Sequence, residues 1–150
     1  MDATDRRLLH AVQRDAGLTA HELGERLNLS ASQAGRRRQR LEAVGVITGS
    51  RAVVAPASLG LGVQAFIQVQ MASHSAENDA SFAQLVRARP EIVAVFTLTG
   101  EADYLLRVWC ADLQGLHRII QGILLPHPAV ARVQSQIVMD QLKPDAPLPV

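Results

Sequence analysis

The chain has 150 residues, 48% of them hydrophobic, which is enough to bury the cores of two small domains or of one medium domain. Its net charge of +1 is unevenly distributed, because residues 1–55 carry nine basic against six acidic side chains and residues 56–150 carry six against eight. The charged N-terminus and the lack of a long apolar run argue against a signal peptide or a membrane anchor and favour the cytoplasm. The single cysteine, Cys110, excludes an intrachain disulfide and a cysteine-based zinc module.

Three short helices are expected in roughly the first 45 residues. Apolar residues at helical spacing follow Thr4, which we expect to cap the first helix. Thr19 with Glu22 and Ser30 with Gln33 fit capping boxes, so two further helices begin within a dozen residues of each other. The apolar residues predicted to face the core of these helices are Leu8, Leu9, Val12, Leu23, Leu27, Ala34, Leu41 and Val44.

The third of these helices is rich in arginine, with four Arg among the five residues 36–40. An arginine-rich helix behind a capped short helix and a tight turn suits DNA, whose phosphates and base edges accept hydrogen bonds from Arg, Gln and Ser. A solvated helix face is the plain alternative. The predicted DNA-binding residues are Ser30, Ser32, Gln33, Arg36, Arg37 and Arg40.

Glycine marks the end of this first domain. Gly45 is expected to end the third helix, and Gly49-Ser50 resembles the turn of a small hairpin, or wing. The stretch that follows is rich in Gly, Pro and Ser, which is typical of a linker. We therefore predict a helix-turn-helix domain over residues 1–51, a linker over 52–62 and a second domain over 63–150.

The second half changes from helical to alternating patterns. Alternation and β-branched residues predict strands at 63–71, 92–99, 104–110 and 130–139, and apolar stripes predict helices at about 79–88 and 112–124. The order strand, helix, strand, strand, helix, strand predicts an α+β, ferredoxin-like domain with a four-stranded antiparallel sheet and both helices on one face.

The other face of this sheet mixes glutamines with large apolar groups. Phe66, Arg107 and Trp109 lie on it, and a combination of aromatic and hydrogen-bonding groups suits a subunit interface. Isolated exposed apolar residues of no functional consequence are the alternative.

The loop between the two central strands has the sequence Thr97-Leu-Thr-Gly-Glu-Ala-Asp103-Tyr104. A plain hairpin turn accounts for it, with Gly100 supplying a positive φ and Asp103 accepting local hydrogen bonds. It also gathers backbone N–H groups, a carboxylate and a phenol, which together can hold both ends of a small zwitterion if another subunit closes the site.

Three stretches together resemble the Lrp/AsnC, or feast/famine, family of transcriptional regulators along essentially the whole chain. Residues 1–9 with Asp15-Ala-Gly17 resemble the family's opening helix and turn, and residues 29–47 its recognition helix and exit. The stretch Thr99-Gly-Glu-Ala-Asp-Tyr-Leu-Leu106 resembles its central loop. Two departures are Arg38, where family members usually have an apolar residue, and Glu101-Ala102 in the loop.

The resemblance implies a cytoplasmic, nucleoid-associated bacterial or archaeal regulator that binds double-stranded operator DNA and responds to an amino acid or related metabolite. It implies homodimers formed through the sheet face, higher oligomers such as octamers, and an effector held between dimers near the central loop, with no metal or cofactor. Carried over to this chain, the effector-binding residues are Gly100, Asp103 and Tyr104, with Thr97, Thr99, Gln136 and Val138 as weaker candidates.

Two other classes of function occur on domains of this strand order. A small-molecule enzyme on a ferredoxin-like domain is the main alternative, but the five histidines form no metal-ligand spacing or catalytic set, and no glycine-rich phosphate loop occurs. An RNA-binding module of the same strand order lacks support because aromatic residues make up only 3% of the chain. We therefore expect a regulator rather than an enzyme.

Overall fold

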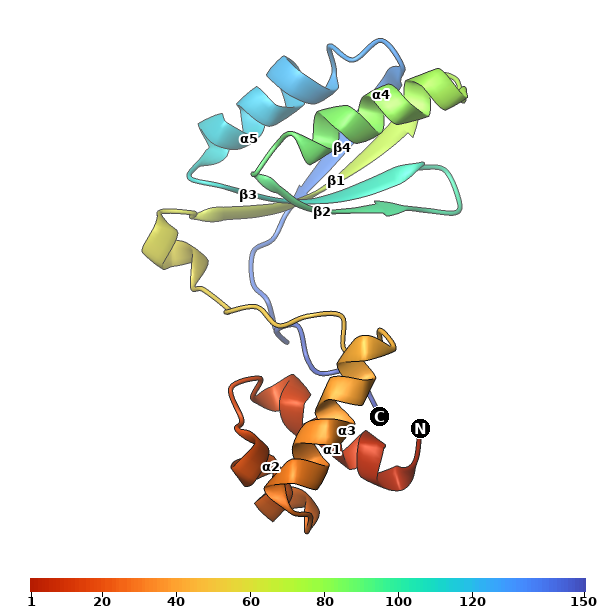
Figure 1. The fold of residues 1–150 in the computed structure, drawn as a ribbon. Coiled ribbons are helices and arrows are strands. Elements are labelled where there is room, and N and C mark those ends of the chain that lie inside the picture. Colours follow the sequence, from red (N-terminus) through yellow and green to blue (C-terminus); the bar gives the residue numbers. More distant parts are fainter. The chain divides into compact units, whose positions relative to one another are not determined.

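The computed structural model describes residues 1–150 and divides them into two compact units (Figure 1). The first unit comprises Met1–Val53 together with Leu142–Val150, and the second comprises Val54–Gln141. Each unit has its own hydrophobic core.

The first unit consists of the three expected helices, α1 (Ala3–Arg14), α2 (Ala20–Leu27) and α3 (Ala31–Ala43). Their apolar faces meet in one core, and a leucine contributed by α1 and another by α2 are fully buried. The buried core residues are Leu8, Leu9, Val12, Leu18, Leu23, Leu27, Ala34 and Leu41.

Capping boxes begin all three helices. Those at Thr19 and Ser30 are confirmed, with the Glu22 and Gln33 side chains reaching back to the N-cap backbone. At α1 the N-cap is Asp2 rather than Thr4, because Asp5 stands three residues after Asp2 and completes a reciprocal box. Three reciprocal boxes satisfy backbone N–H groups that helix ends otherwise leave without partners.

The turn between α2 and α3 is tight enough to require glycine. A Cβ on Gly24 would lie 2.7 Å from the Leu29 carbonyl oxygen, and the Leu29 N–H donates to the Gly24 carbonyl at 2.9 Å. Asn28 takes the left-handed conformation, with φ at 56°, and ends α2. This close contact fixes where α3 begins relative to α2.

The segment after α3 differs from the sequence prediction. Gly45 has φ at 74°, and the N–H groups of Val46 and Ile47 both donate to the Leu41 carbonyl, which ends the helix as expected. Val44 lies at this cap and is 66% exposed rather than buried. No strand pairs at Gly49-Ser50, so the expected wing is wrong; a two-stranded hairpin needs a surface to pack on, and Val53 is 96% exposed.

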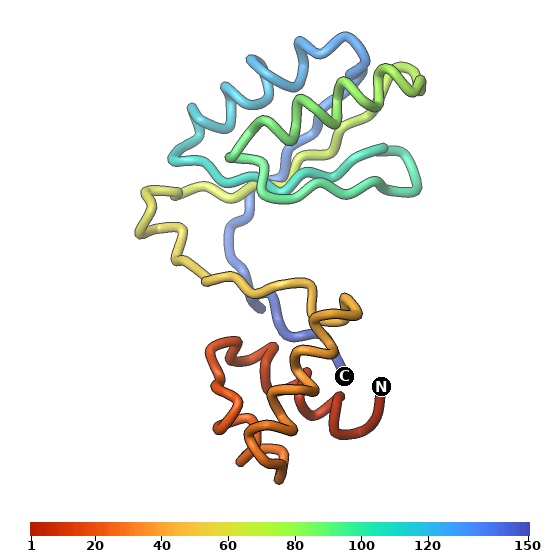
Figure 2. The backbone as a smooth tube through the Cα atoms, viewed as in Figure 1, coloured from red at the N-terminus to blue at the C-terminus, as the bar shows by residue number.

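The second unit contains four strands and two helices in the predicted ferredoxin-like order, preceded by a short 3-10 turn, Pro56–Leu59. The elements are β1 (Val63–Met71), α4 (Ala76–Arg87), β2 (Ile92–Thr97), β3 (Tyr104–Cys110), α5 (Leu113–Ile119) and β4 (Val130–Ile137). The strands form one antiparallel sheet with the order β2-β3-β1-β4, and both helices cover the same face of it (Figure 1). Figure 2 follows the path of the backbone through this unit by residue number.

The alternation along β1 and β3 determines which side chains the helices cover. On β1 the residues Ala65, Ile67 and Val69 are fully buried, as are Leu106 and Val108 on β3. Phe82 of α4 and Leu124 are also fully buried in this core. The buried face therefore packs on the helices, and the intervening residues form the other face of the sheet.

Several boundaries differ from the expected ones. The helix predicted from residue 79 begins at Ala76, and the strands predicted to reach residues 99 and 139 end at Thr97 and Ile137. The predicted helix 112–124 is α5 followed by a π-helical turn, Ile120–Leu124, with Asp112 accepting from the Gly115 N–H at 2.7 Å as the cap. The segment Leu142–Val150, predicted as part of the second domain, groups with the first unit, where Leu148 and the Gln13 amide exchange two hydrogen bonds.

Candidate nucleic-acid interface and ligand site

The N-terminal end of α3 carries three of the predicted DNA-contacting side chains. Ser30, Ser32 and Gln33 are all exposed there. The Ser30 hydroxyl accepts from the Gln33 N–H at 3.2 Å, and the Gln33 amide oxygen accepts from the Ser30 N–H at 3.0 Å. The cap thus fixes both residues at the end of the helix where donors for an anion gather.

Arg37 and Arg40 lie one turn apart on α3 and both contact Asp5 of α1. The Arg37 guanidinium lies 2.8 Å from Asp5 Oδ1 and 2.7 Å from Asp2 Oδ2, and Arg40 Nη2 lies 2.5 Å from Asp5 Oδ2. The Asp5 side chain is 1% exposed, whereas those of Arg37 and Arg40 are 31% and 55% exposed. These two arginines therefore brace α3 against α1 while their outer N–H groups still meet solvent.

The charge on Asp5 is stabilised in spite of its burial. Burial raises the pKa of Asp5, but the Asp2 N–H and the guanidinium groups of Arg37 and Arg40 outweigh that effect, so the net pKa of Asp5 is lowered. The neighbouring Asp2 also has a lowered pKa, caused first by its hydrogen bond with Arg37. Sequence analysis did not single out Asp5; its partners stand more than 30 residues along the chain.

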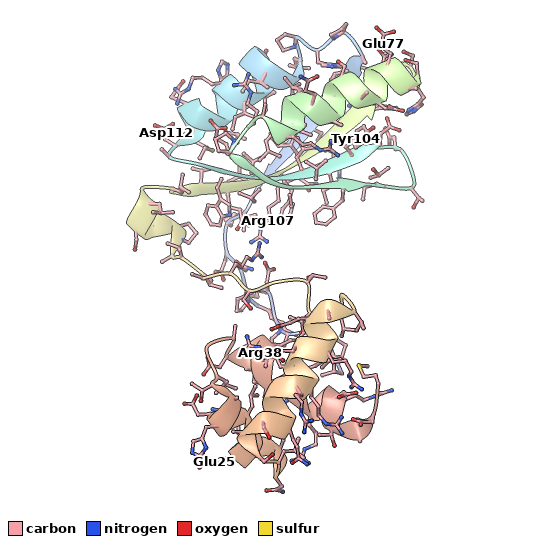
Figure 3. All side chains as sticks on the ribbon, viewed as in Figure 1. Glu25, Arg38, Glu77, Tyr104, Arg107 and Asp112 are labelled. Atoms are coloured by element: carbon pink, nitrogen blue, oxygen red, sulfur yellow. The ribbon has the colours of Figure 1, made fainter.

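The contacts of Arg38 account for its presence at a position where family members usually have an apolar residue (Figure 3). Its Nη1 donates to the Leu18 carbonyl at 3.0 Å and its Nη2 to the Ala16 carbonyl at 3.2 Å, while its Nε pairs with Glu42 at 2.9 Å. Arg38 therefore ties α3 to the loop between α1 and α2, a role that an apolar residue cannot fill.

Arg36 is the arginine of α3 that makes no ion pair. It is exposed and lines a hollow of about 370 Å³ beside the helix. Each of the other three α3 arginines forms an ion pair with a carboxylate. The residues lining this hollow are Leu29, Gln33, Arg36, Arg37 and Arg40.

In the second unit, Asp103 fastens the loop between β2 and β3 to the end of β1. Its Oδ2 accepts from the Met71 N–H at 2.6 Å, and its backbone N–H donates to the Val69 carbonyl at 3.0 Å. Its Oδ1 lies 3.2 Å from Nε2 of His74, which is 63% exposed. One carboxylate oxygen thus has a structural partner, and the other faces a group on the solvent side.

Tyr104 follows Asp103 and points toward α4 (Figure 3). Its hydroxyl donates to Asp79 Oδ1 at 3.4 Å, and its ring packs on Phe82 with the ring centroids 4.8 Å apart. Burial and the nearby Asp79 carboxylate raise the pKa of Tyr104, so the phenol keeps its proton and remains a donor. Tyr104 therefore supports the loop from the helix-covered face.

The tip of the loop leaves donors free. Gly100 has φ at 113°, a conformation that favours glycine, and the N–H groups of residues 99–102 make no hydrogen bond within the chain. Beside the tip, Arg132 Nη1 lies 3.4 Å from Glu101 Oε1 across a hollow of about 40 Å³. Sequence analysis missed most of this lining, which is polar except for Ala102 and consists of Gln68, Gln70, Glu101, Ala102, Arg132 and Gln134.

The weaker effector candidates do not all lie at this loop. Thr97 and Thr99 flank it and are exposed. Gln136 pairs in register with Phe66, and the Val138 N–H donates to the Gln64 carbonyl. At about 3.3 Å per residue, Gln64 lies roughly 17 Å along β1 from Val69, so a single subunit does not bring Val138 to the loop.

The sheet face opposite α4 and α5 carries Arg107 (Figure 3) and, by strand pairing and alternation, the other predicted interface residues, Phe66 and Trp109. Phe66 pairs in register with Arg107, and Gln64 with Trp109. With the Gln64 amide oxygen turned toward it, Arg107 donates from Nε at 2.7 Å and from Nη2 at 3.1 Å. Phe96 lies on the same face and is 51% exposed, so apolar area surrounds an ordered polar centre.

Other chemistry finds little support in the structure. No three His, Cys, Asp or Glu side chains gather in a group that could hold a metal ion. Cys110 is buried, and burial raises the pKa of its thiol, which suits a core residue better than a nucleophile. None of the helices has the length and hydropathy needed to cross a bilayer.

A helix-turn-helix unit with an arginine-bearing third helix, followed by a ferredoxin-like unit with an open loop, defines a two-domain DNA-binding regulator. The comparisons agree: residues 1–42 match the AsnC-type helix-turn-helix domain, and residues 64–148 match the Lrp/AsnC ligand binding domain. The chain belongs to the Lrp/AsnC family of transcriptional regulators.

Relatives match over essentially the full chain. The DNA-binding transcriptional activator DecR of Escherichia coli is 33% identical over 150 residues, covering 100% of this chain and 99% of DecR. The glutamate uptake regulatory protein of Zymomonas mobilis is also 33% identical, covering 100% of this chain and 91% of that protein. A Neisseria meningitidis regulator solved as a complex with L-methionine is 37% identical with a TM-score of 0.95, covering 99% of this chain and 96% of that one.

Proposed function

We propose that this regulator binds an α-amino acid at the β2–β3 loop and that the ligand alters its assembly or its hold on operator DNA. The observation that carries the proposal is that the loop has hydrogen-bonding groups without partners in the chain. Free N–H groups at residues 99–102 suit a carboxylate, and the solvent-facing oxygen of Asp103 suits an ammonium group. An α-amino acid presents both groups.

The size of the hollow supports a shared site. Small-molecule pockets enclose about 300–1,000 Å³, whereas the hollow beside Glu101 and Arg132 measures about 40 Å³. A second subunit over the loop would supply the missing walls, and that subunit could also contribute Gln136 and Val138. The L-methionine complex of the Neisseria relative and the printed role of the Zymomonas relative support amino acids as the ligand class.

A thermal-shift screen against the twenty amino acids and common keto acids tests the proposal. A ligand that binds only the folded protein stabilises it by about 2.7 kcal/mol at 100 times its Kd, which is readily detected. L-methionine and L-glutamate are the first compounds to test. If no amino acid raises the melting temperature, and none changes the affinity for DNA, this effector assignment fails.

On the DNA side, we propose that α3 enters the major groove, with Ser30, Ser32, Gln33 and Arg36 nearest the bases and phosphates. The geometry that supports this is the exposed, capped end of α3 and the unpaired Arg36. Arg37 and Arg40 would contribute through their outer N–H groups only, because Asp5 occupies the inner ones.

For assembly, we propose homodimers formed through the sheet face that carries Phe66, Arg107 and Trp109, and further association of dimers, for example into octamers. Sedimentation of the full chain should give a dimer or larger species. Trp109→Ala should weaken the dimer by about 2 kcal/mol or more if the indole is an anchor. A full-length chain that sediments as a monomer at micromolar concentration would contradict this interface.

A further inference from the structure

The arginines of the first unit divide into two groups by their partners. On α3, Arg37 and Arg40 pair with Asp5, and Arg38 pairs with Glu42. The second group lies on α1 and α2 and makes no ion pair with any carboxylate: Arg6, Arg7, Arg14 and Arg26. The helix expected to bind DNA is thus partly neutralised and keeps one unpaired arginine, Arg36, while four unpaired arginines lie on α1 and α2.

This second group lines one hollow of about 520 Å³, together with His10. All five side chains are exposed, and no acidic side chain lines the hollow, whose other residues are Ala11, Leu27 and Val150. Arg7 Nη2 donates to the Arg26 carbonyl at 3.0 Å, and the Arg14 guanidinium contacts the His10 ring. We call Arg6, Arg7, His10, Arg14 and Arg26 the α1–α2 basic surface.

Part of this surface also serves the fold, because Arg7 joins α1 to the end of α2. Arg7, His10 and Arg14 follow one another at spacings of three and four residues, so they share one face of α1. The apolar contacts that seat α1 come from its other face, where Leu8 and Val12 are buried. Apart from the Arg7 bond and the Arg14 contact with His10, the exposed guanidinium groups have N–H donors left over for an anionic partner.

We propose that the α1–α2 basic surface binds the phosphodiester backbone of duplex DNA and supplies sequence-independent contacts in addition to those of α3. This inference rests on the DNA-binding function and adds a second surface to it. Seven residues of helix separate Arg7 from Arg14, about 10 Å, which matches roughly three base steps along one strand. Guanidinium groups bind phosphate in a bidentate manner, and each neutralised phosphate releases counterions.

The test uses the full-length protein and a duplex of random sequence. The variant Arg7→Gln/Arg14→Gln/Arg26→Gln removes three positive charges with a residue that keeps helix propensity. The control Arg87→Gln/Arg89→Gln/Arg118→Gln removes three exposed charges from the second unit. Affinity is measured by fluorescence anisotropy over a salt series, and thermal melting checks that each variant folds.

We expect the first variant to lower the slope of log K against log salt by about 0.9 per lost phosphate contact, or up to roughly 2.7 in total. Its affinity for the random duplex should fall about tenfold or more. Its melting temperature should fall only slightly, since one exposed hydrogen bond, from Arg7 to the Arg26 carbonyl, is lost. The control variant should keep the wild-type slope.

Three outcomes would overturn the inference. An unchanged slope in the first variant would mean that no phosphate contact was lost. An equal loss in both variants would assign the effect to net charge alone. A change in sedimentation without a change in slope would assign the surface to an acidic segment of another subunit. Failure of the wild-type protein to bind any duplex would instead contradict DNA binding itself, before any variant is compared.

Discussion

The side chains of Asp5 in the helical unit and Asp103 in the sheet unit both accept hydrogen bonds from the backbone. They differ in how much of each side chain solvent can reach. Each accepts a hydrogen bond from a backbone N–H, from Asp2 at 3.1 Å in one case and from Met71 at 2.6 Å in the other. Asp5 is 1% exposed and faces two guanidinium groups, whereas Asp103 is 23% exposed and faces His74.

This difference in access suits Asp5 to bracing the fold and Asp103 to the ligand-binding role proposed for it. The two oxygens of Asp5 are enclosed by partners from the same unit, so nothing external can reach them. One oxygen of Asp103 is likewise occupied, but the other has only the exposed His74 ring beside it. A ligand ammonium group can take the place of that ring.

The largest expected effect is a loss of effector affinity when Asp103 is replaced. Asp103→Ala should lower effector affinity at least about thirtyfold, because removing one partner of a desolvated charge pair typically costs 2–5 kcal/mol. Calorimetry with the amino acid found in the thermal screen measures this loss. DNA affinity without the effector should stay at the wild-type value, because α3 belongs to the other unit.

Asp103→Asn separates direct binding from positioning. The asparagine oxygen can still accept from the Met71 N–H, so the loop should stay in place, while the charge that would pair with an ammonium group is lost. We expect the Asn variant to melt like the wild type and yet to bind the effector as weakly as the Ala variant. If the Asn variant kept the wild-type effector affinity, Asp103 would only position the loop and would not bind the ligand through its charge.

Much of the molecule follows from local sequence patterns. The boxes at Thr19 and Ser30 and the alternation along β1 involve residues close together in the chain, so spacing alone predicts them. The competition between Thr4 and Asp2 for the first cap was also local, and the acidic partner at Asp5 decided it. The spacing of Asp2 and Asp5 is therefore a local signal for this cap.

Other features depend on contacts that spacing does not encode. The pairs of Asp5 with Arg37 and Arg40 join residues more than 30 positions apart, so an arginine-rich helix looked uniformly available for DNA. Arg132 reaches Glu101 only because β4 lies beside β1. The grouping of Leu148 with Gln13 needs the folded helical unit and leaves no local pattern.

The helical side of the comparison is tested by Asp5→Ala. Removing a buried carboxylate leaves two arginines without their shared partner, and we expect a loss of about 2–4 kcal/mol in the free energy of unfolding of this unit. Urea unfolding followed by far-UV circular dichroism measures it. The exposed Asp2→Ala is the matched comparison and should cost less; an equal or larger loss there would contradict the bracing role of Asp5.

Arg36 and Arg40 sharpen the comparison between free and paired charges. Arg36→Gln should lower the salt slope of operator binding by about one unit, because a phosphate contact is lost while the fold keeps all of its ion pairs. Arg40→Gln should change the slope less and the stability more, since its Nη2 serves Asp5. Anisotropy over a salt series and thermal melting separate the two. Equal slopes and equal stabilities in the two variants would erase the distinction.

The smallest expected effect is the pH dependence that Asp5 confers on stability. Because the pKa of Asp5 is lowered in the folded state, the unfolded chain binds more protons between that pKa and the ordinary value near 4. The stability that Asp5 contributes is therefore complete above about pH 5 and is lost as the pH falls through the folded-state pKa.

One such group changes the free energy of unfolding by at most about 1.4 kcal/mol per pH unit. Urea unfolding at pH values from about 6 down to about 3, a range that spans the ordinary carboxyl pKa, measures this slope in the wild type and in Asp5→Asn. The Asn variant should show a shallower slope, with the remainder coming from Asp2 and Glu22, whose pKa values are also lowered. An unchanged slope in Asp5→Asn would mean that the buried pair with Arg37 and Arg40 contributes nothing to acid sensitivity.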